Sequence, residues 1–165
     1  MNDLRYKPNL LQRSVQRVAM LRPSAWLLSR TLHHLDPPVY RLTGGKSTLA
    51  GLLSGLPVIT LVTTGAKSGQ PRAVPLIAIP HADDLIVIAS NWGGQSHPAW
   101  YYNLKAHPAC TAEVNGRSLP HTAHELTGEA KTAAWETAVR LYPGYAAYQK
   151  RAPRDIPVLK LLAVS

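Results

Sequence analysis

The chain has 165 residues, of which 45% are hydrophobic and only one is a cysteine. This length and composition fit one globular domain with its own core, and the single cysteine, Cys110, excludes an internal disulfide and a multi-cysteine metal site. The formal net charge of +9 implies an anionic partner, which would be membrane lipid, nucleic acid, or a phosphorylated or carboxylated small molecule.

Residues 1–45 are expected to form an amphipathic helix and a linker that precede a domain in residues 46–165. Leu11 and Val15 follow helical spacing, whereas Arg13 falls on another face. The favoured interpretation is that this helix packs on the domain, and the alternative is peripheral contact with an anionic membrane. No uncharged run here is long enough to span a bilayer or to serve as a signal peptide. A cytoplasmic protein is therefore expected, with the inner face of the cell membrane as the alternative location.

Three apolar, β-branched runs follow from Pro57 and read PVITLVTTG, RAVPLIAIP and LIVIAS. They predict consecutive antiparallel strands, and Pro75 and Pro80 predict edges or bulges in the second one. The segment HPAWYYNLKAHP predicts a helix. Pro98 suits the first position of this helix, and Pro108 prevents the helix from extending further.

The remaining segments predict a hairpin, a helix and a last strand. TAEVNGRSLPHTAHEL contains an Asn-Gly turn, GEAKTAAWETAVRLY is helical in character, and IPVLKLLAV closes the series. The resulting order β-β-β-α-β-β-α-β lacks the alternation that a parallel sheet needs. The sequence therefore predicts an α+β fold in which a small antiparallel barrel carries its helices on the outside.

The residues provide no metal site and no strong nucleophile or base. His121 and His124 are three apart on a predicted strand, so they point to opposite faces, and His33 and His34 are adjacent. The carboxylates are scattered and form no acid/base dyad, and Cys110 has no activating neighbour in the sequence. An enzyme of this composition has to take its reactivity from a cofactor.

Three segments at strand ends could bind such a cofactor. GAKSGQPR has two glycines that permit close backbone approach, with Ser68 as a donor and Lys67 and Arg72 to neutralise a phosphate. SNWGGQSHPAW leads into a helix N-terminus, which favours anions. LYPGYAAYQK spaces three tyrosines so that one helical face could carry the rings. Taken singly, the first segment is better explained as an ordinary exposed hairpin, and the tyrosines as a core-packing stripe.

Together these segments make residues 57–158 similar to the deazaflavin-dependent nitroreductase family, actinobacterial split-barrel proteins that use coenzyme F420. The resemblance is carried by TTGAKSGQPRAVPL, IASNWGGQSHPAWYYNLKAHP and LYPGYAAYQKRAPRDIPV. It implies a split antiparallel β-barrel of the FMN-binding type, with coenzyme F420 expected rather than FMN. It also implies hydride transfer to an electron-poor acceptor, such as a quinone, an enone or a nitroaromatic compound.

The resemblance further implies roles for individual residues. The phosphate and anionic tail of the cofactor would meet the first segment, and its ring would lie by the start of the second strand. The implied cofactor-binding residues are Ala66, Lys67, Ser68, Gly69, Gln70, Pro71, Arg72, Val74, Pro75, Leu76, Ser90, Asn91, His97, Pro98, Ala99, Trp100 and Tyr142. The implied substrate-binding residues are Trp92, Tyr142, Tyr145 and Tyr148. Ser90, Tyr142 and Tyr145 are the catalytic candidates, as hydroxyl donors to the acceptor oxygen. Family members often carry Arg or Lys where this chain has Ala66, so one tail contact is expected to be weaker.

Three hypotheses of function follow: an F420H2-dependent reductase, an FMN-binding split-barrel oxidoreductase, and a non-catalytic module that binds a cofactor or lipid by its basic surface. Nucleic acid is the weakest partner, because the basic residues are not interleaved with stacking aromatics. The expected partner is a small-molecule acceptor, and the chain is expected to be a monomer or a homodimer.

Overall fold

The structure is a computed structural model, which describes residues 12, 14, 55–114 and 116–164. The predicted N-terminal helix and linker in residues 1–45 therefore lie outside the described part, apart from two isolated residues. In the described part no helix has the length and apolar composition needed to cross a bilayer.

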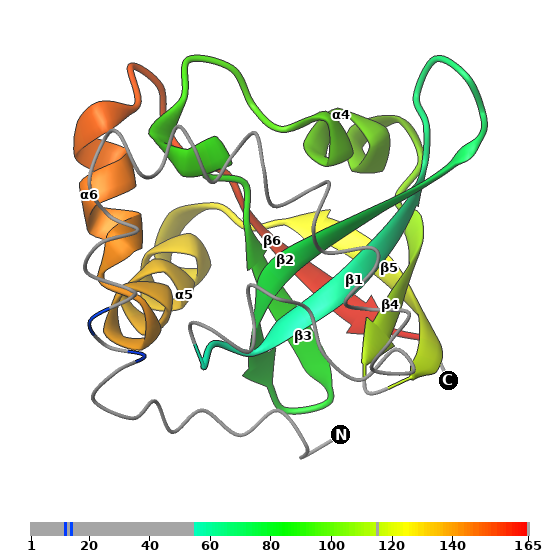
Figure 1. The fold of residues 1–165 in the computed structure, drawn as a ribbon, viewed down its shortest axis with the longest axis horizontal. Helices are drawn as coiled ribbons and strands as arrows, with labels where there is room; N and C mark the ends of the chain where they lie inside the picture. Colours follow the sequence, from blue (N-terminus) through cyan, green and yellow to red (C-terminus); the bar gives the residue numbers. More distant parts are fainter. Residues whose placement is uncertain (1–11, 13, 15–54, 115, 165) are drawn as a thin grey trace.

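Six strands close into one antiparallel barrel in the order β1-β2-β3-β6-β5-β4 (Figure 1). The strands are β1 (Val58–Thr64), β2 (Pro71–His81), β3 (Asp84–Ile88), β4 (Ala109–Val114), β5 (Arg117–Glu125) and β6 (Val158–Ala163). The helices are the 3-10 turn η1 (Asn91–Gly93), α4 (Ala99–Ala106), α5 (Gly128–Leu141) and α6 (Gly144–Arg151). The predicted α+β antiparallel barrel with outer helices is confirmed.

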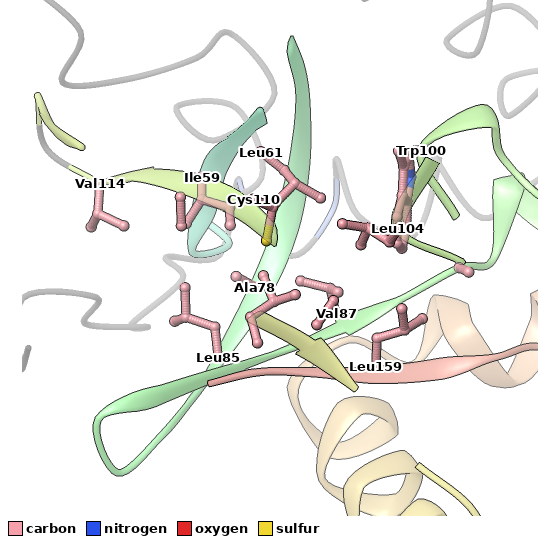
Figure 2. Packing of buried hydrophobic residues seen from close by; sticks show 14 residues of the cluster. Ile59, Leu61, Ala78, Leu85, Val87, Trp100, Leu104, Cys110, Val114 and Leu159 are labelled. Carbon is pink, nitrogen blue, oxygen red and sulfur yellow. The ribbon is translucent and has the colours of Figure 1, made fainter. Parts of the chain in front are cut away.

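The barrel interior is filled by alternate residues of the strands. In β1, Ile59 and Leu61 point inward and are almost completely buried, whereas the residues between them are half-buried. Trp100 and Leu104 of α4 join the same cluster, and Figure 2 shows their side chains directed toward those of the strands. Burying each such side chain stabilises the fold by about 1.5–3 kcal/mol. Helix α4 therefore caps one end of the barrel.

A second cluster lies between the outside of the barrel and helices α5 and α6. In β3, Leu85 and Val87 belong to the barrel interior, while Ile86 and Ile88 pack against the helices. A strand that is buried on both faces cannot show polar alternation, which explains why LIVIAS is uniformly apolar. Ala134 and Ala138 supply small buried positions on α5, where the helix approaches the sheet.

The two prolines of β2 lie where this strand has a neighbour on one side only. Residues 71–77 pair with β1, which covers Pro75, and residues 78–81 pair with β3, which covers Pro80. A proline lacks the N–H that a second neighbour would need, so the predicted edge character is confirmed. From Ala78 onward β2 pairs with β3 in place of β1.

Two details of the helices differ from the prediction. Helix α4 begins at Ala99, with Pro98 as the residue before it, so the predicted start is wrong by one residue. The order also contains an additional helix, α6, because Pro143 separates it from α5. Tyr142 has extended backbone angles at the end of α5, so the three tyrosines do not share one helix.

Candidate functional site

The β1–β2 loop, residues 65–70, is closed by its own backbone. The N–H of Gly65 donates to Gln70 O (2.9 Å), and the N–H of Gly69 donates to Gly65 O (2.8 Å). Gly69 has a φ of +66°, which favours glycine, and a Cβ at Gly65 would lie 2.6 Å from Ser68 Oγ. The conformation of the loop alone therefore explains why both positions are glycine, and a close approach of a ligand is not needed to explain them.

Most amides of this loop already have acceptors. Ala66 N–H donates to Asn103 Oδ1 (3.0 Å), and Gln70 N–H donates to Ser68 Oγ (3.3 Å). Within the described residues, the N–H groups of Lys67 and Ser68 have no acceptor. The expectation that the whole loop backbone binds phosphate is therefore too broad, and two consecutive amides remain for that role.

Asn103 of α4 holds the loop to the barrel, and sequence analysis assigned it no role. Its Oδ1 accepts from Ala66 N–H, and its Nδ2 donates to Thr63 Oγ1 (3.0 Å). The side chains of Asn103 and Thr63 are both buried, so losing either partner would leave polar atoms unsatisfied. A signal was present in the sequence: Asn103 is three residues from Trp100, on the face that α4 buries.

The cations of this region are available to a ligand. Lys67 and Arg72 are exposed, and neither forms an ion pair with any residue that the structure describes. Residues 65–72 contain no carboxylate, so nothing within the segment competes for these cations. Two cations beside two unpaired amides are a donor set suited to a phosphate or carboxylate group.

The start of β2 presents two different faces. Val74 and Leu76 are half-buried and pack on the interior cluster together with Tyr101 of α4. Pro75 alternates with them and pairs with Thr60 of β1, so its ring points to the other face. Of the three residues implied for the ring pocket, the structure brings Val74 and Leu76 to one face and places Pro75 on the opposite one.

The β3–α4 loop, residues 89–98, holds a strained turn. Asn91, Trp92 and Gly93 have φ values of +47°, +57° and +77°, a left-handed conformation that is rare for a tryptophan. Asn91 Nδ2 donates to Ser96 O (2.9 Å), which closes the turn. The turn is pressed against α6, because a Cβ on Gly93 would lie 2.8 Å from Tyr148 O.

The end of the loop leads into α4. His97 and Pro98 are half-buried and Ala99 is exposed, whereas Trp100 is buried in the barrel interior. The His97 ring packs on Tyr101, with ring centroids 4.7 Å apart. Trp100 is therefore a residue of the hydrophobic core. His97, by contrast, places a polar side chain beside the β3–α4 loop.

The three tyrosines form one buried cluster. Tyr142, Tyr145 and Tyr148 are each at most 4% exposed, and their ring centroids lie 5.4–6.3 Å apart in edge-on contacts. The hydroxyls of Tyr142 and Tyr148 are hydrogen-bonded at 3.0 Å. The Trp92 ring lies 6.0 Å from that of Tyr148, which brings the cluster beside the β3–α4 loop.

Comparison with known proteins assigns this barrel to a family. The family of F420H(2)-dependent quinone reductases matches residues 34–163. The F420H(2)-dependent quinone reductase of Mycobacterium tuberculosis strain H37Rv is 32% identical over 145 residues, covering 84% of this chain and 96% of that protein. The chain belongs to the F420H(2)-dependent quinone reductase family.

Solved structures agree with this assignment. A structure described as an F420-H2 dependent reductase (FDR-A) is 42% identical, with a TM-score of 0.59, and the match covers 64% of this chain and 93% of that one. A second, described as a domain-swapped dimer, is 36% identical with a TM-score of 0.61, over 84% of this chain and 98% of that one. As a member of the F420H(2)-dependent quinone reductase family, the protein is a split-barrel oxidoreductase that depends on coenzyme F420. The first of the three hypotheses of function is confirmed.

The remaining polar residues of the barrel do not add a nucleophile to this member of the family. Burial raises the pKa of the Cys110 thiol to about 11, which keeps it protonated at neutral pH. His121 is buried and His124 is exposed, in agreement with their predicted opposite faces. In the part of the chain that the structure describes, no three potential metal ligands come together.

Sequence analysis missed two further residues, Arg154 and Gln149, and the loop that Arg154 contacts is distant from it in sequence. Arg154, after α6, donates to the carbonyl of Ser96 (2.9 Å) in the β3–α4 loop. Gln149 of α6 in turn donates to the carbonyl of Arg154 (3.0 Å) and accepts from Ile156 N–H (3.2 Å). Nothing in the local pattern RAPRD predicts a contact with a loop more than fifty residues earlier.

Proposed function

We propose that this chain binds reduced coenzyme F420 between the β1–β2 loop and the β3–α4 loop and uses it to reduce a quinone. The observation that carries the proposal is the donor set of the β1–β2 loop. Lys67, Arg72 and the amides of residues 67 and 68 have no partner among the described residues, and Asn103 fixes the loop that carries them. An anionic cofactor tail supplies the negative groups that this set lacks.

The residues present fit that cofactor at both of its ends. The cations and amides of the β1–β2 loop would hold the phosphate and tail, and Val74 and Leu76 would give the ring an apolar surface. When bound, reduced F420 supplies a hydride to an electron-poor acceptor. The chain contributes binding and orientation, which hold the donor and acceptor at reacting distance.

The tyrosine cluster can stabilise the charge that develops on the acceptor oxygen. Burial raises the pKa of Tyr142, Tyr145 and Tyr148, so all three hydroxyls stay protonated at physiological pH. When the hydroxyl of Tyr148 donates to that of Tyr142, the proton of Tyr142 is available to an acceptor. We propose this role for Tyr142, with Ser90 as a further donor from the β3–α4 loop.

Replacing Tyr142 with phenylalanine is expected to lower kcat for menadione by about 10²-fold, the usual effect of one lost donor to a developing oxyanion. Phenylalanine keeps the ring, whereas alanine would leave a cavity costing about 3–5 kcal/mol in this core. Stopped-flow oxidation of F420H2 measures the effect. Thr132→Val is the control, because it removes an exposed hydroxyl of α5 that bonds only the carbonyl of Gly128 among the described residues. Unchanged turnover in Tyr142→Phe would make the cluster a packing element alone.

The proposed function predicts binding and turnover by the purified protein. Titration with F420 is expected to quench tryptophan emission, and the reduced cofactor is expected to be oxidised when menadione is added. Binding of F420 without oxidation by any quinone would contradict the proposed reaction. Copurification of FMN, released on heating, would favour the FMN alternative.

We also propose that the chain forms a homodimer. The support is its likeness to a structure described as a domain-swapped dimer, which it matches over 84% of its own length. Light scattering after size exclusion is expected to give twice the mass of one chain, and a single-chain mass at micromolar concentration would contradict the proposal. Contact of residues 1–45 with a membrane stays a prediction, since these residues lie outside the described part.

A further inference from the structure

Among the side chains that the structure describes, that of Arg154 forms the most hydrogen bonds to the β3–α4 loop. One terminal nitrogen, Nη2, donates to the carbonyls of Ser90 (3.1 Å) and Ser96 (2.9 Å). The other, Nη1, lies 2.8 Å from Nδ1 of His97, and both nitrogens are 3.4 Å from the carbonyl of Ala89. The guanidinium therefore spans the loop from its first residue to the residue before Pro98.

The contact with His97 determines which ring nitrogen carries the proton. A guanidinium can only donate, so Nδ1 of His97 must accept. In the neutral ring the proton then resides on Nε2. The one hydrogen bond of the His97 side chain to a described residue is at Nδ1, so Nε2 has no such partner, and the side chain is half-buried rather than enclosed. His97 therefore presents one N–H donor of fixed orientation beside the β3–α4 loop.

The charges around His97 keep this ring neutral. Burial lowers its pKa, and the Arg154 guanidinium lowers it further, because protonation would place two positive charges in contact. The carboxylates of Glu125 and Asp155 act in the opposite direction without reversing the shift. Tyr101 and Tyr102 pack on the ring, and burial raises the pKa of Tyr101, so its hydroxyl stays uncharged at neutral pH.

We infer that Arg154 is a positioning residue of the cofactor site: it holds the β3–α4 loop in place and fixes His97 as a neutral Nε2–H donor to a carbonyl or phenolate oxygen of the deazaflavin ring or the quinone. This rests on the proposed function, because it takes the loop as one wall of that site. Gln149 supports the arrangement, since it bonds the backbone on both sides of Asp155 and so ties Arg154 to α6.

The first experiment uses no cofactor. Long-range ¹⁵N–¹H NMR of the histidine rings, with His97→Asn for assignment, reports the tautomer and pKa of His97 in the whole chain. We expect a neutral Nε2–H ring in the wild type, with a pKa below the ordinary value of about 6.5. In Arg154→Met both tautomers should appear and the pKa should rise. Arg140→Met, which removes an exposed arginine of α5, should leave the signals of His97 unchanged. A wild-type ring protonated on Nδ1, or a pKa unmoved in Arg154→Met, would overturn the inference.

The second experiment separates the two roles of Arg154. Arg154→Met is expected to weaken F420 binding roughly tenfold at pH 8, the scale of a lost hydrogen bond in a misplaced loop. Its affinity should recover as the pH falls through about 6.5, because His97 then gains a charge beside an anionic ligand. The wild type should show no such step. Arg154→Lys keeps the charge but loses the planar fork, so it should weaken binding without adding the step.

The oxygen that accepts from His97 belongs either to the cofactor or to the quinone, and the binding constants of His97→Asn distinguish the two. A weaker F420 Kd in His97→Asn assigns the donor to the cofactor, whereas an unchanged Kd with a raised KM for menadione assigns it to the quinone. If neither constant changes, His97 donates to no ligand and the inference fails. Absence of F420 binding in the wild type would instead refute the proposed function, and the NMR result would still decide whether Arg154 sets the protonation of His97.

Discussion

Replacing both Lys67 and Arg72 with alanine is expected to weaken F420 binding by more than about 100-fold. Each side chain offers a charge-assisted contact of about 1.5–3 kcal/mol to an anionic group. Stability should change by less than about 0.5 kcal/mol, since both side chains are exposed and make no ion pair within the described part of the chain. Fluorescence titration and urea denaturation measure the two quantities.

The control for this variant is Arg117→Ala. Arg117 is also exposed, but it starts β5 opposite Val114, at the far end of the barrel from the β1–β2 loop. Its loss should change affinity only through long-range charge, which salt screens. An equal loss of affinity in both variants at 0.15 M salt would show that the net charge attracts the cofactor and that the loop makes no direct contact.

Replacing Gly93 with alanine is expected to lower the free energy of unfolding by about 3 kcal/mol. Its φ of +77° is unfavourable for alanine by about 1–2 kcal/mol. The new Cβ would also lie 2.8 Å from Tyr148 O and 3.1 Å from Tyr148 Cα, backbone atoms that cannot turn aside. The turn and α6 would have to separate, which should weaken cofactor binding as well.

Gly128→Ala isolates the backbone contribution to this loss. Gly128 also has a positive φ, +55°, but a Cβ there would meet nothing within 4 Å. The free energy of unfolding of Gly128→Ala should therefore fall by about 1 kcal/mol in the same urea experiment. Equal losses in the two variants would mean that the packing of the turn against α6 contributes nothing to stability.

The barrel could be predicted from the sequence because its signals are local. Alternating and β-branched runs marked the strands, and prolines marked the stretches of β2 that pair on one side. The additional helix α6 was missed because GYAAYQKR is short and polar between two prolines. Its position depends on the burial of Tyr145 and Tyr148 against the sheet, a tertiary effect that no local pattern contains.

The site was predictable only in part, for the same reason. The composition of the β1–β2 loop indicated an anion site, but not that most of its amides are already bonded. Asn103 and Arg154, the two side chains that hold the two loops, contact loop residues at least 37 and 57 positions away. The spacing of the three tyrosines likewise could not show whether their rings pack in the core or line a substrate site.

The order of the strands has a consequence for synthesis of the protein. Strand β6 is the last described strand in sequence, yet it lies between β3 and β5 and completes the sheet. Arg154, which holds the β3–α4 loop, lies in the segment between α6 and this strand. A chain emerging from the ribosome therefore exposes its other strands before the barrel can close. Capture of the cofactor should be a late event, and bound F420 would mark only chains whose folding is complete.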